Sequence, residues 1–487
     1  EWTNPTPSGR YNLVVMGAGT AGLVTAAIAA GLGARVALIE RHLMGGDCLN
    51  VGCVPSKGIV RAARAWAAAA NGNEFGIPPV TETSGDFGKV MERMRRLRAQ
   101  LSRVDSAQRF KDLGVDVFIG HGRFTNPETI QVENSTLRFS HAAICTGARA
   151  AAPPIPGLND VGYLTNETVF SLTTRPARLA VIGGGPIGCE IAQAFARFGS
   201  QVTLLEQLDR ILPREDTDAA DIVRNRMERD GVTFALGIKV GAVQRRGHQK
   251  LIHYTSHDGK KLELMVDNIL VGVGRAPNID GLGLEEAGVR FDSAGVTVDT
   301  SLRTSNRRIY AAGDVCFPFK FTHTADAMAQ IVIQNALFPH PFGLGKADTR
   351  SLIIPWCTFT EPEVAHVGMY ETDATAKGVK VETFTLPLGE VDRAILDGES
   401  EGFVRVHVRE GTDTIVGATI VAGHAGSLIS EITVAMQAGK GLSLIGSTIH
   451  PYPTQSEAIR KVANLVRKTR FSSRQKSLLA HWFQWTR

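Results

Sequence analysis

Residues 11–40 read YNLVVMGAGTAGLVTAAIAAGLGARVALIE, and residues 177–206 read ARLAVIGGGPIGCEIAQAFARFGSQVTLLE. Each stretch has an apolar run, a Gly-rich turn, an Ala-rich run and a second apolar run that ends in a glutamate. This order predicts a strand, a tight turn, a helix and a second strand, which begin a Rossmann-like unit. One glycine triplet is a weak signal, but two copies in this context favour two dinucleotide-binding units. The alternative is two such units that hold no nucleotide.

The turn glycines follow the spacing Gly-x-Gly-x-x-Gly in both copies. The first glycine permits the tight turn, the second lets a pyrophosphate approach the backbone, and the third lets the helix pack close to the strand. Glu40 and Glu206 each stand 18 residues after the last glycine, where a carboxylate can accept hydrogen bonds from ribose hydroxyls. The glycines are Gly17, Gly19 and Gly22 in the first copy and Gly183, Gly185 and Gly188 in the second.

The charge is unevenly distributed along the chain. The net charge is +5, but residues 460–487 contain eight Lys or Arg and no Asp or Glu. The remainder has 45 basic and 48 acidic residues, so it gives no reason to expect nucleic acid as a partner. The first ten residues, EWTNPTPSGR, have no apolar signal core, and no apolar run is long enough to span a membrane. We therefore expect a cytoplasmic protein.

Two of the six cysteines, Cys48 and Cys53, lie in the stretch GGDCLNVGCVPSK at residues 45–57. A regular helix does not bring side chains at i and i+5 together, so the first turn would have to be distorted. A helix N-terminus stabilises a thiolate, and Lys57 adds positive charge one turn later. We interpret the two cysteines as a redox-active pair, with two unpaired structural cysteines as the alternative.

The stretch 45–57 resembles the active-site signature of the class I pyridine nucleotide–disulfide oxidoreductases. The segments AICTGA near 143–148, VGVGRAPN at 271–278 and IYAAGDV at 309–315 resemble later motifs of the same family. The resemblance implies an α/β fold with two Rossmann-like dinucleotide-binding domains and a C-terminal α+β dimerisation domain. The implied domains are an FAD-binding domain in two parts (10–152 and 276–348), an NAD(P)-binding domain (153–275), an interface domain (349–465) and a basic, aromatic C-terminal extension (466–487).

The resemblance also implies roles for residues. Cys53 would be the thiol next to the flavin, Cys48 the interchange thiol that meets the substrate, and Lys57 would pair with Glu190. A plain helix carboxylate is the alternative for Glu190. The residues expected to bind FAD, from the glycine motif or the resemblance, are Gly17, Gly19, Thr20, Ala21, Gly22, Glu40, Arg41, Gly46, Asp47, Cys48, Lys57, Gly122, Thr146, Gly147, Gly313, Asp314, Thr322 and His323. Those expected to bind NAD are Gly183, Gly185, Ile187, Gly188, Glu190, Glu206, Val240 and Gly274.

The sequence departs from the family near its C-terminal end. Members that reduce disulfides carry His-Pro-Thr-x-Ser-Glu there, supplied by the partner subunit, whereas residues 450–457 here read HPYPTQSE. Tyr452 therefore occupies the acid–base position, His450 precedes it by two residues, and Glu457 is the orienting glutamate. Mercuric reductases have a tyrosine at this position. The resemblance to the family's His-Pro bond implies that the Tyr452–Pro453 bond is cis. A packing residue at the dimer seam is the alternative for Tyr452.

Two hallmarks of mercuric reductases are missing from the sequence, a vicinal Cys-Cys at the C-terminus and a Cys-x-x-Cys domain at the N-terminus. No cluster with metal-ligand spacing is found elsewhere, so we expect no resident metal. The acceptor therefore stays open among a disulfide, a metal ion and a related small molecule.

The expected cofactors are FAD and NADH. NADH is favoured over NADPH because a carboxylate at Glu206 would repel a 2′-phosphate, and Arg210 follows too late in the loop to compensate. The expected enzyme is a homodimer that oxidises NAD(P)H and passes electrons to its acceptor. A dihydrolipoamide dehydrogenase, and a membrane-docked electron-transfer subunit that needs a partner, are the alternatives.

The extension 466–487 combines basic residues with Leu478, Leu479, Trp482, Phe483 and Trp485. Basic and Trp-rich composition suits a peripheral contact with an anionic membrane surface. A helix packed on the dimer or a disordered end is the alternative.

Overall fold

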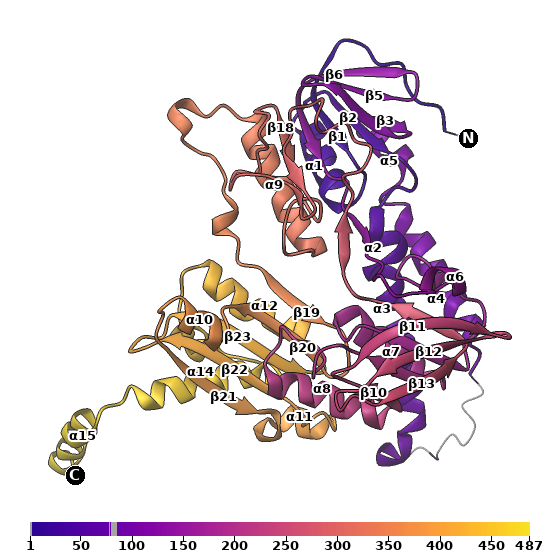
Figure 1. Cartoon of the computed structure of the whole chain (residues 1–487). Helices are drawn as coiled ribbons and strands as arrows, with labels where there is room; N and C mark the ends of the chain where they lie inside the picture. The colour runs from indigo at the N-terminus through magenta and orange to yellow at the C-terminus, as the bar shows by residue number, and fades with distance from the viewer. Residues whose placement is uncertain (1, 77, 79–84) are drawn as a thin grey trace. The chain divides into compact units, whose positions relative to one another are not determined.

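The computed structural model describes residues 2–76, 78 and 85–487, and Figure 1 follows the chain through them. The chain forms two compact units. The first runs to Asp209 and resumes at Gly231–Leu352, and the second comprises Arg210–Asp230 and Ile353–Arg487.

The larger sheet of the first unit grows from the first strand–turn–helix stretch. Its order is β3-β2-β1-β6-β5-β4, with β18 paired to β6, and β1, β2, β3, β6 and β18 pair in parallel. Parallel strands are buried on both faces and read as nearly continuous apolar runs, as residues 13–16 do. The strands are β1 (Arg10–Met16), β2 (Val36–Glu40), β3 (Asp116–Ile119), β4 (Gly122–Asn126), β5 (Thr129–Val132), β6 (Ser135–Ile144) and β18 (Ile309–Ala311).

The second strand–turn–helix stretch builds a four-stranded parallel sheet with the order β10-β9-β8-β14. An antiparallel sheet, β11-β12-β13, follows it along the chain, and β15 pairs with β7. The strands are β7 (Ala148–Ala150), β8 (Arg178–Ile182), β9 (Gln201–Leu205), β10 (Val232–Ala235), β11 (Lys239–Arg246), β12 (Gln249–Thr255), β13 (Lys261–Val266), β14 (Asn268–Val271), β15 (Arg275–Pro277), β16 (Phe291–Asp292) and β17 (Gly295–Val296).

Helices bring distant parts of the first unit together. Helix α1 packs against α9, and α3 packs against α7, so helices that are far apart in the sequence become neighbours. The α-helices of this unit are α1 (Thr20–Gly31), α2 (Gly46–Val51), α3 (Cys53–Ala70), α4 (Phe87–Ser102), α5 (Ala107–Asp112), α6 (Leu158–Val161), α7 (Pro186–Arg197) and α9 (Thr322–Leu337).

The second unit is built on an antiparallel five-stranded sheet with the order β19-β20-β23-β22-β21. Its core joins apolar side chains of the sheet to those of α12, α13 and α14. The strands are β19 (Pro355–Thr358), β20 (Glu363–Gly368), β21 (Val381–Pro387), β22 (Phe403–Arg409) and β23 (Ile415–Ala422). The α-helices are α8 (Thr217–Arg229), α10 (Glu371–Ala376), α11 (Asp392–Leu396), α12 (Ala425–Gln437), α13 (Leu442–Ser447), α14 (Glu457–Thr469) and α15 (Ser473–Trp485).

The predicted fold class is confirmed, with two sheets that each contain parallel strands joined through a glycine turn, and a C-terminal α+β unit. The finer boundaries at 152, 275 and 348 stay predictions, and α8 groups with the C-terminal unit rather than with the second sheet. Among the helices described, none combines the length and apolar character that crossing a bilayer requires.

Candidate active site

The first and last glycines of the glycine turns leave no space for side chains. Gly17 has a φ of +104°, and a Cβ there would lie 2.4 Å from the carbonyl oxygen of Cys145. A Cβ at Gly22 would lie 1.8 Å from the oxygen of Gly17. The second turn repeats this packing, since a Cβ at Gly188 would lie 2.0 Å from the oxygen of Gly183. These glycines are therefore required by close backbone approach, as the motif predicts.

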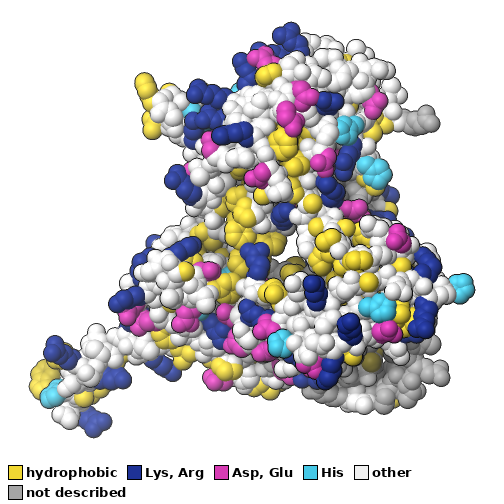
Figure 2. Space-filling view, in the orientation of Figure 1, with side chains coloured by type: hydrophobic (Ala, Val, Ile, Leu, Met, Phe, Trp, Pro, Cys, Tyr) yellow, Lys and Arg dark blue, Asp and Glu magenta, His cyan; other side chains and the backbone are white. Residues whose placement is uncertain are grey.

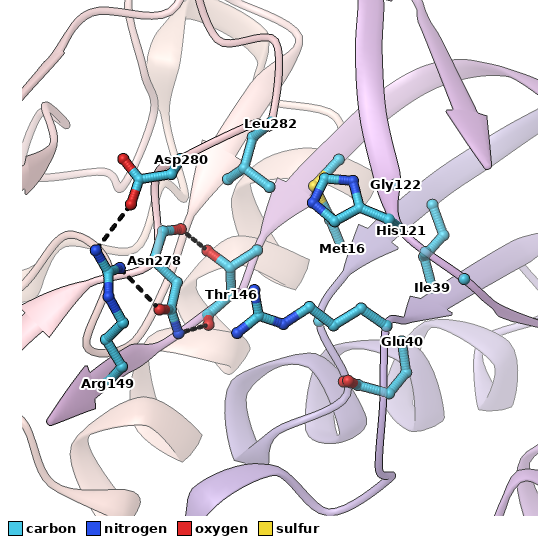
Figure 3. A pocket seen from close by; sticks show the side chains of 13 residues that line it. Met16, Ile39, Glu40, His121, Gly122, Thr146, Arg149, Asn278, Asp280 and Leu282 are labelled. Carbon is cyan, nitrogen blue, oxygen red and sulfur yellow. Dashed lines mark hydrogen bonds and ion pairs between the residues drawn. The ribbon is translucent and has the colours of Figure 1, made fainter. Parts of the chain in front are cut away.

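A cavity of about 280 Å³ lies beside the first turn (Figure 3). Glu40 stands on its wall and accepts hydrogen bonds from the backbone N–H groups of Ala18 (2.8 Å) and His42 (2.9 Å). Across the cavity, Thr146 donates to the carbonyl of Asn278 at 2.7 Å. A glycine turn, a fixed carboxylate and a cavity of this size fit the adenosine end of FAD. The lining residues are Met16, Gly17, Ile39, Glu40, Arg41, Gly120, His121, Gly122, Thr146, Arg149, Asn278, Asp280 and Leu282.

The other residues expected at FAD lie at the ends of elements near the first turn. A Cβ at Gly46 would lie 2.5 Å from the Cα of Gly19, so the start of α2 approaches the turn backbone to backbone. Gly19 is the N-cap of α1, and the first turn of this helix contains Thr20, Ala21 and Gly22. Helix α2 begins with Gly46 and Asp47, and helix α9 begins with Thr322 and His323. Gly147 lies between β6 and β7, and β18 is followed by Gly313 and Asp314.

Gly52 separates the helices that carry the two cysteines. Helix α2 ends at Val51, Gly52 has φ −129° and ψ −120°, and α3 begins at Cys53. A Cβ at Gly52 would lie 2.7 Å from the carbonyl oxygen of Asp47 and 3.1 Å from the Cα of Cys48. This non-helical residue is the distortion that the cysteine spacing predicts, and both cysteines are present as free thiols.

Cys53 is the more acidic thiol of the pair. A hydrogen bond from Cys48 lowers the pKa of Cys53 to about 6, and Thr322 and the charge of Lys57 act in the same direction while burial opposes them. The Thr322 hydroxyl lies 3.5 Å from the Cys53 sulfur. The same hydrogen bond, together with burial, raises the pKa of Cys48. The site therefore holds one thiolate on Cys53 and one thiol on Cys48 at neutral pH.

An ion pair joins the two nucleotide-binding folds at the cysteine helix. Lys57 Nζ lies 2.8 Å from Glu190 Oε2, and the Glu190 side chain is only 6% exposed. The two residues come from α3 and α7, which pack together. The predicted contact between Lys57 and Glu190 is therefore present. It places a positive charge next to Cys53 and satisfies a buried carboxylate.

Arg275 is a charged residue of the site that the sequence analysis missed. Its guanidinium forms an ion pair with Asp47 at the start of α2 and lies 3.2 Å from Asp314 Oδ2. Burial raises the pKa of Asp314, and the positive charge of Arg275 opposes this shift. The motif VGVGRAPN contains Arg275, but nothing local to it indicates partners in two distant motifs.

The second glycine turn repeats the geometry of the first. Glu206 accepts hydrogen bonds from the backbone N–H groups of Gly184 (2.5 Å) and Leu208 (2.9 Å), which matches the contacts of Glu40. A Cβ at Gly185 would meet no atom within 4 Å, so a ligand can approach this backbone. This geometry fits the adenosine end of NAD(P)H. Ile187, Gly188 and Glu190 lie on α7, Val240 lies in β11, and Gly274, with φ +128°, precedes β15.

Tyr452 lies in the second unit and is 70% exposed. Its hydroxyl donates to Asp392 Oδ2 at 2.9 Å, and this hydrogen bond raises the pKa of Tyr452. The predicted cis Tyr452–Pro453 bond is confirmed. Asp392, at the start of α11 and 60 residues away in the sequence, thus holds the hydroxyl as a neutral donor. No sequence motif predicted this role of Asp392.

Neither His450 nor Glu457 contacts the Tyr452 hydroxyl through a hydrogen bond between described residues. His450 Nε2 lies 2.7 Å from Glu431 Oε1, and Nδ1 lies 3.0 Å from the carbonyl oxygen of Thr448. Both ring nitrogens of His450 therefore face oxygen atoms of the second unit. Glu457 is buried at the start of α14.

Candidate metal ligands do not form a cluster in the part of the chain that the structure describes. In residues 2–76, 78 and 85–487, no three His, Cys, Asp or Glu side chains are arranged to hold a metal ion.

Two family models match the chain. The model of pyridine nucleotide-disulphide oxidoreductases matches residues 11–330, and the dimerisation domain of the same family matches residues 354–463. The chain belongs to the pyridine nucleotide-disulphide oxidoreductase family. It is a flavin-dependent oxidoreductase that uses FAD and NAD(P)H and acts on a disulfide or a metal ion.

Curated relatives carry two activities. The chain is 35% identical to a mercuric reductase of Staphylococcus aureus, over 93% of this chain and 82% of that protein. It is 32% identical to a dihydrolipoyl dehydrogenase of Bacillus subtilis (strain 168), over 93% of this chain and 97% of the relative.

Among solved structures, the chain is similar to the Cu(II) complex of the HOCl-induced flavoprotein disulfide reductase RclA from Escherichia coli. The TM-score is 0.83 at 30% identity, and the match covers 94% of this chain and 100% of that chain.

Proposed function

We propose that this chain is an NADH-dependent flavoenzyme that reduces a thiol-binding metal ion through Cys53 and Cys48 and works as a homodimer. The observation that carries the choice of acceptor is the hydrogen bond from Tyr452 to Asp392 at the acid–base position. Mercuric reductases among the relatives, and a Cu(II) complex of a similar protein, support the same class of acceptor.

The proton requirement separates the two classes of acceptor. Reducing a disulfide releases a thiolate that must be protonated. A group that exchanges protons near neutral pH therefore accelerates the reduction of a disulfide. Tyr452 does not supply one, because its hydrogen bond to Asp392 raises its pKa further above neutral. A metal ion held by two thiolates needs electrons but no such proton. The balanced reaction for a divalent ion is NADH + M²⁺ → NAD⁺ + H⁺ + M⁰, or two one-electron reductions in the case of Cu(II).

The chain's own residues prepare this reaction. FAD, when bound, supplies the two-electron chemistry that links the nicotinamide to the cysteine pair. Gly17 and Glu40 would hold its adenosine end. The hydrogen bond from Cys48, assisted by Thr322 and Lys57, lowers the pKa of Cys53 and favours its thiolate. Cys48 is the thiol proposed to meet the acceptor. A metal ion displaces its proton on binding, because thiolates and not thiols ligate metals.

The preference for NADH rests on the region around Glu206. Both carboxylate oxygens are held by backbone N–H groups, so the charge stays where a 2′-phosphate would lie. Arg210 does not offset it, since its guanidinium donates to the carbonyl oxygens of Pro213 and Glu215 within its own turn.

Steady-state kinetics test the nicotinamide. We expect kcat/KM for NADH to exceed that for NADPH by at least about tenfold, and Glu206→Ala to narrow the ratio. Asp209→Asn, which removes a charge from the same loop, is the matched control and should leave the ratio unchanged. A wild-type preference for NADPH would refute this part of the proposal.

An anaerobic acceptor panel tests the substrate class. Enzyme reduced with NADH is mixed with Hg(II), Cu(II), lipoamide, glutathione disulfide and quinones, and reoxidation is followed. We expect the metal ions to reoxidise it faster than either disulfide, and Cys48→Ser to abolish the effect. Turnover of lipoamide at the rate of the metal ions would instead favour the second candidate, a dihydrolipoamide dehydrogenase, which the Bacillus subtilis relative supports.

The homodimer and the compartment are parts of the same proposal. The match of residues 354–463 to a dimerisation domain supports two copies in the working enzyme. A cytoplasmic location is proposed because redox-active cysteine pairs are the usual form of disulfide in reducing compartments.

A further inference from the structure

We propose that helix α15 is a peripheral membrane anchor that docks on bilayers containing anionic lipid. This surface lies outside the redox site and adds a location to the proposed activity. Every residue from 471 to 487 is exposed, so none of the described parts of the chain covers this helix.

The apolar residues of α15 share one side of the helix. Successive residues turn by roughly 100°, so Leu478, Trp482 and Trp485 form one stripe, and Leu479 and Phe483 extend it to an arc of roughly 160°. The rings of Trp482 and Trp485 lie 5.3 Å apart, as neighbours in one stripe should. All five side chains are between 39% and 77% exposed. Figure 2 shows hydrophobic and basic side chains together on this helix.

Basic residues border the apolar arc. By the same geometry, Arg474 lies at one edge and Lys476 at the other, while Ser477 and Gln484 mark the opposite polar face. Basic side chains at this border reach lipid phosphates while their stems stay on the apolar side. No acidic residue follows Glu457, so nothing in this segment opposes the attraction.

The helix has a local start signal, but no part of the chain that the structure describes packs over it. Ser472 accepts from the backbone of Gln475 at 3.2 Å, and Gln475 accepts in return from the backbone of Ser472 at 2.8 Å. A helix of 13 residues is marginal in water, even with such a cap. Burial of its apolar arc in a membrane interface would supply the missing stabilisation, and charge complementarity selects an anionic surface.

Vesicle co-sedimentation with the FAD-loaded full chain tests this inference. We expect binding to mixed phosphatidylglycerol–phosphatidylcholine vesicles at low salt and little binding to phosphatidylcholine alone. Replacing Trp482 and Trp485 by Ser, or Arg474 and Lys476 by Ser, should lower the partition coefficient roughly tenfold or more. The polar-face variant with Ser477→Ala and Gln484→Ala is the matched control and should bind like the wild type.

Three outcomes would overturn the anchor. The first is that the Trp variant sediments with vesicles as much as the wild type does. The second is that the wild type binds neutral and anionic vesicles equally well. The third is that the wild type does not bind vesicles and that the tail variants change the dimer–monomer equilibrium. The last outcome would place the helix on a second copy of the chain. NADH-dependent ferricyanide reduction should be unchanged in every tail variant, so failure of the anchor is distinguishable from failure of the proposed activity.

Discussion

At the scale of single residues, Cys53 is controlled by side chains from three different segments. Cys48, Thr322 and Lys57 all lower its pKa, which is about 6. The thiolate should therefore be present above pH 6 and be lost as the pH falls through that value.

Replacing Lys57 tests this control. Lys57→Met removes the positive charge, so we expect the pKa of Cys53 to rise and its alkylation by iodoacetamide at pH 6 to slow. A shift of one pKa unit lowers the thiolate fraction there severalfold. Lys377→Met, at an exposed lysine of the second unit, is the control. An unchanged alkylation profile in Lys57→Met would show that the ion pair with Glu190 does not tune the thiol.

Tyr452 and Asp392 form a second testable contact. Tyr452→Phe removes the hydrogen bond of 2.9 Å, and Asp392→Asn removes the negative charge that strengthens it, so we expect acceptor reduction to slow about tenfold in both variants. NADH-dependent ferricyanide reduction should stay unchanged, because it does not need the acceptor side of the cysteine pair. Asp392→Asn should also lower the pKa of Tyr452, which a pH profile of acceptor reduction would detect.

The matched control for this contact is Asp397→Asn. Asp397 ends the same short helix but pairs with Arg393 at 2.7 Å rather than with Tyr452. Equal slowing in Asp397→Asn and Asp392→Asn would show that the effect comes from the helix and not from the hydroxyl contact.

At the scale of elements, the break between α2 and α3 positions the cysteine pair. A Cβ at Gly52 would lie 2.7 Å from the carbonyl oxygen of Asp47, so Gly52→Ala must push the two helices apart. We expect a loss of about 1–3 kcal/mol in the free energy of unfolding and slower disulfide formation between the cysteines.

Gly31→Ala is the control for this substitution. A Cβ at Gly31, an exposed residue at the end of α1, meets no atom within 4 Å, so we expect a neutral effect on stability. Urea denaturation and thiol titration of both variants measure the difference. Equal stability and equal disulfide formation in the two variants would show that the break tolerates a side chain.

At the scale of the whole molecule, the proposed homodimer assigns Tyr452 of one subunit to the cysteine pair of the other. Mixed dimers of a Cys48→Ser chain and a Tyr452→Phe chain would then contain one intact site and one site with both changes. We expect such heterodimers to regain about half of the wild-type rate of acceptor reduction, because a two-fold dimer has two equivalent sites. No gain over the parent variants would place each tyrosine at its own subunit's cysteines.

Local patterns in the sequence determined the parts of this protein that depend on a few neighbouring residues. The glycine turns, the two glutamates and the break between the cysteines follow from turn sterics and spacing, and the structure has them as predicted. The Lys57–Glu190 pair needed the family resemblance, because its members are 133 residues apart.

Only the tertiary structure decided which distant side chains complete the site. Thr322 at the start of α9 lies 3.5 Å from the sulfur of Cys53, 269 residues away in the sequence, Arg275 pairs with both Asp47 and Asp314, and Asp392 accepts a hydrogen bond from Tyr452. No periodicity or motif encodes these contacts, because they depend on how whole helices and sheets pack. The sequence thus predicted the proposed electron path up to Cys48, and the packing of the chain decided which charged groups lie next to the two thiols and next to the tyrosine.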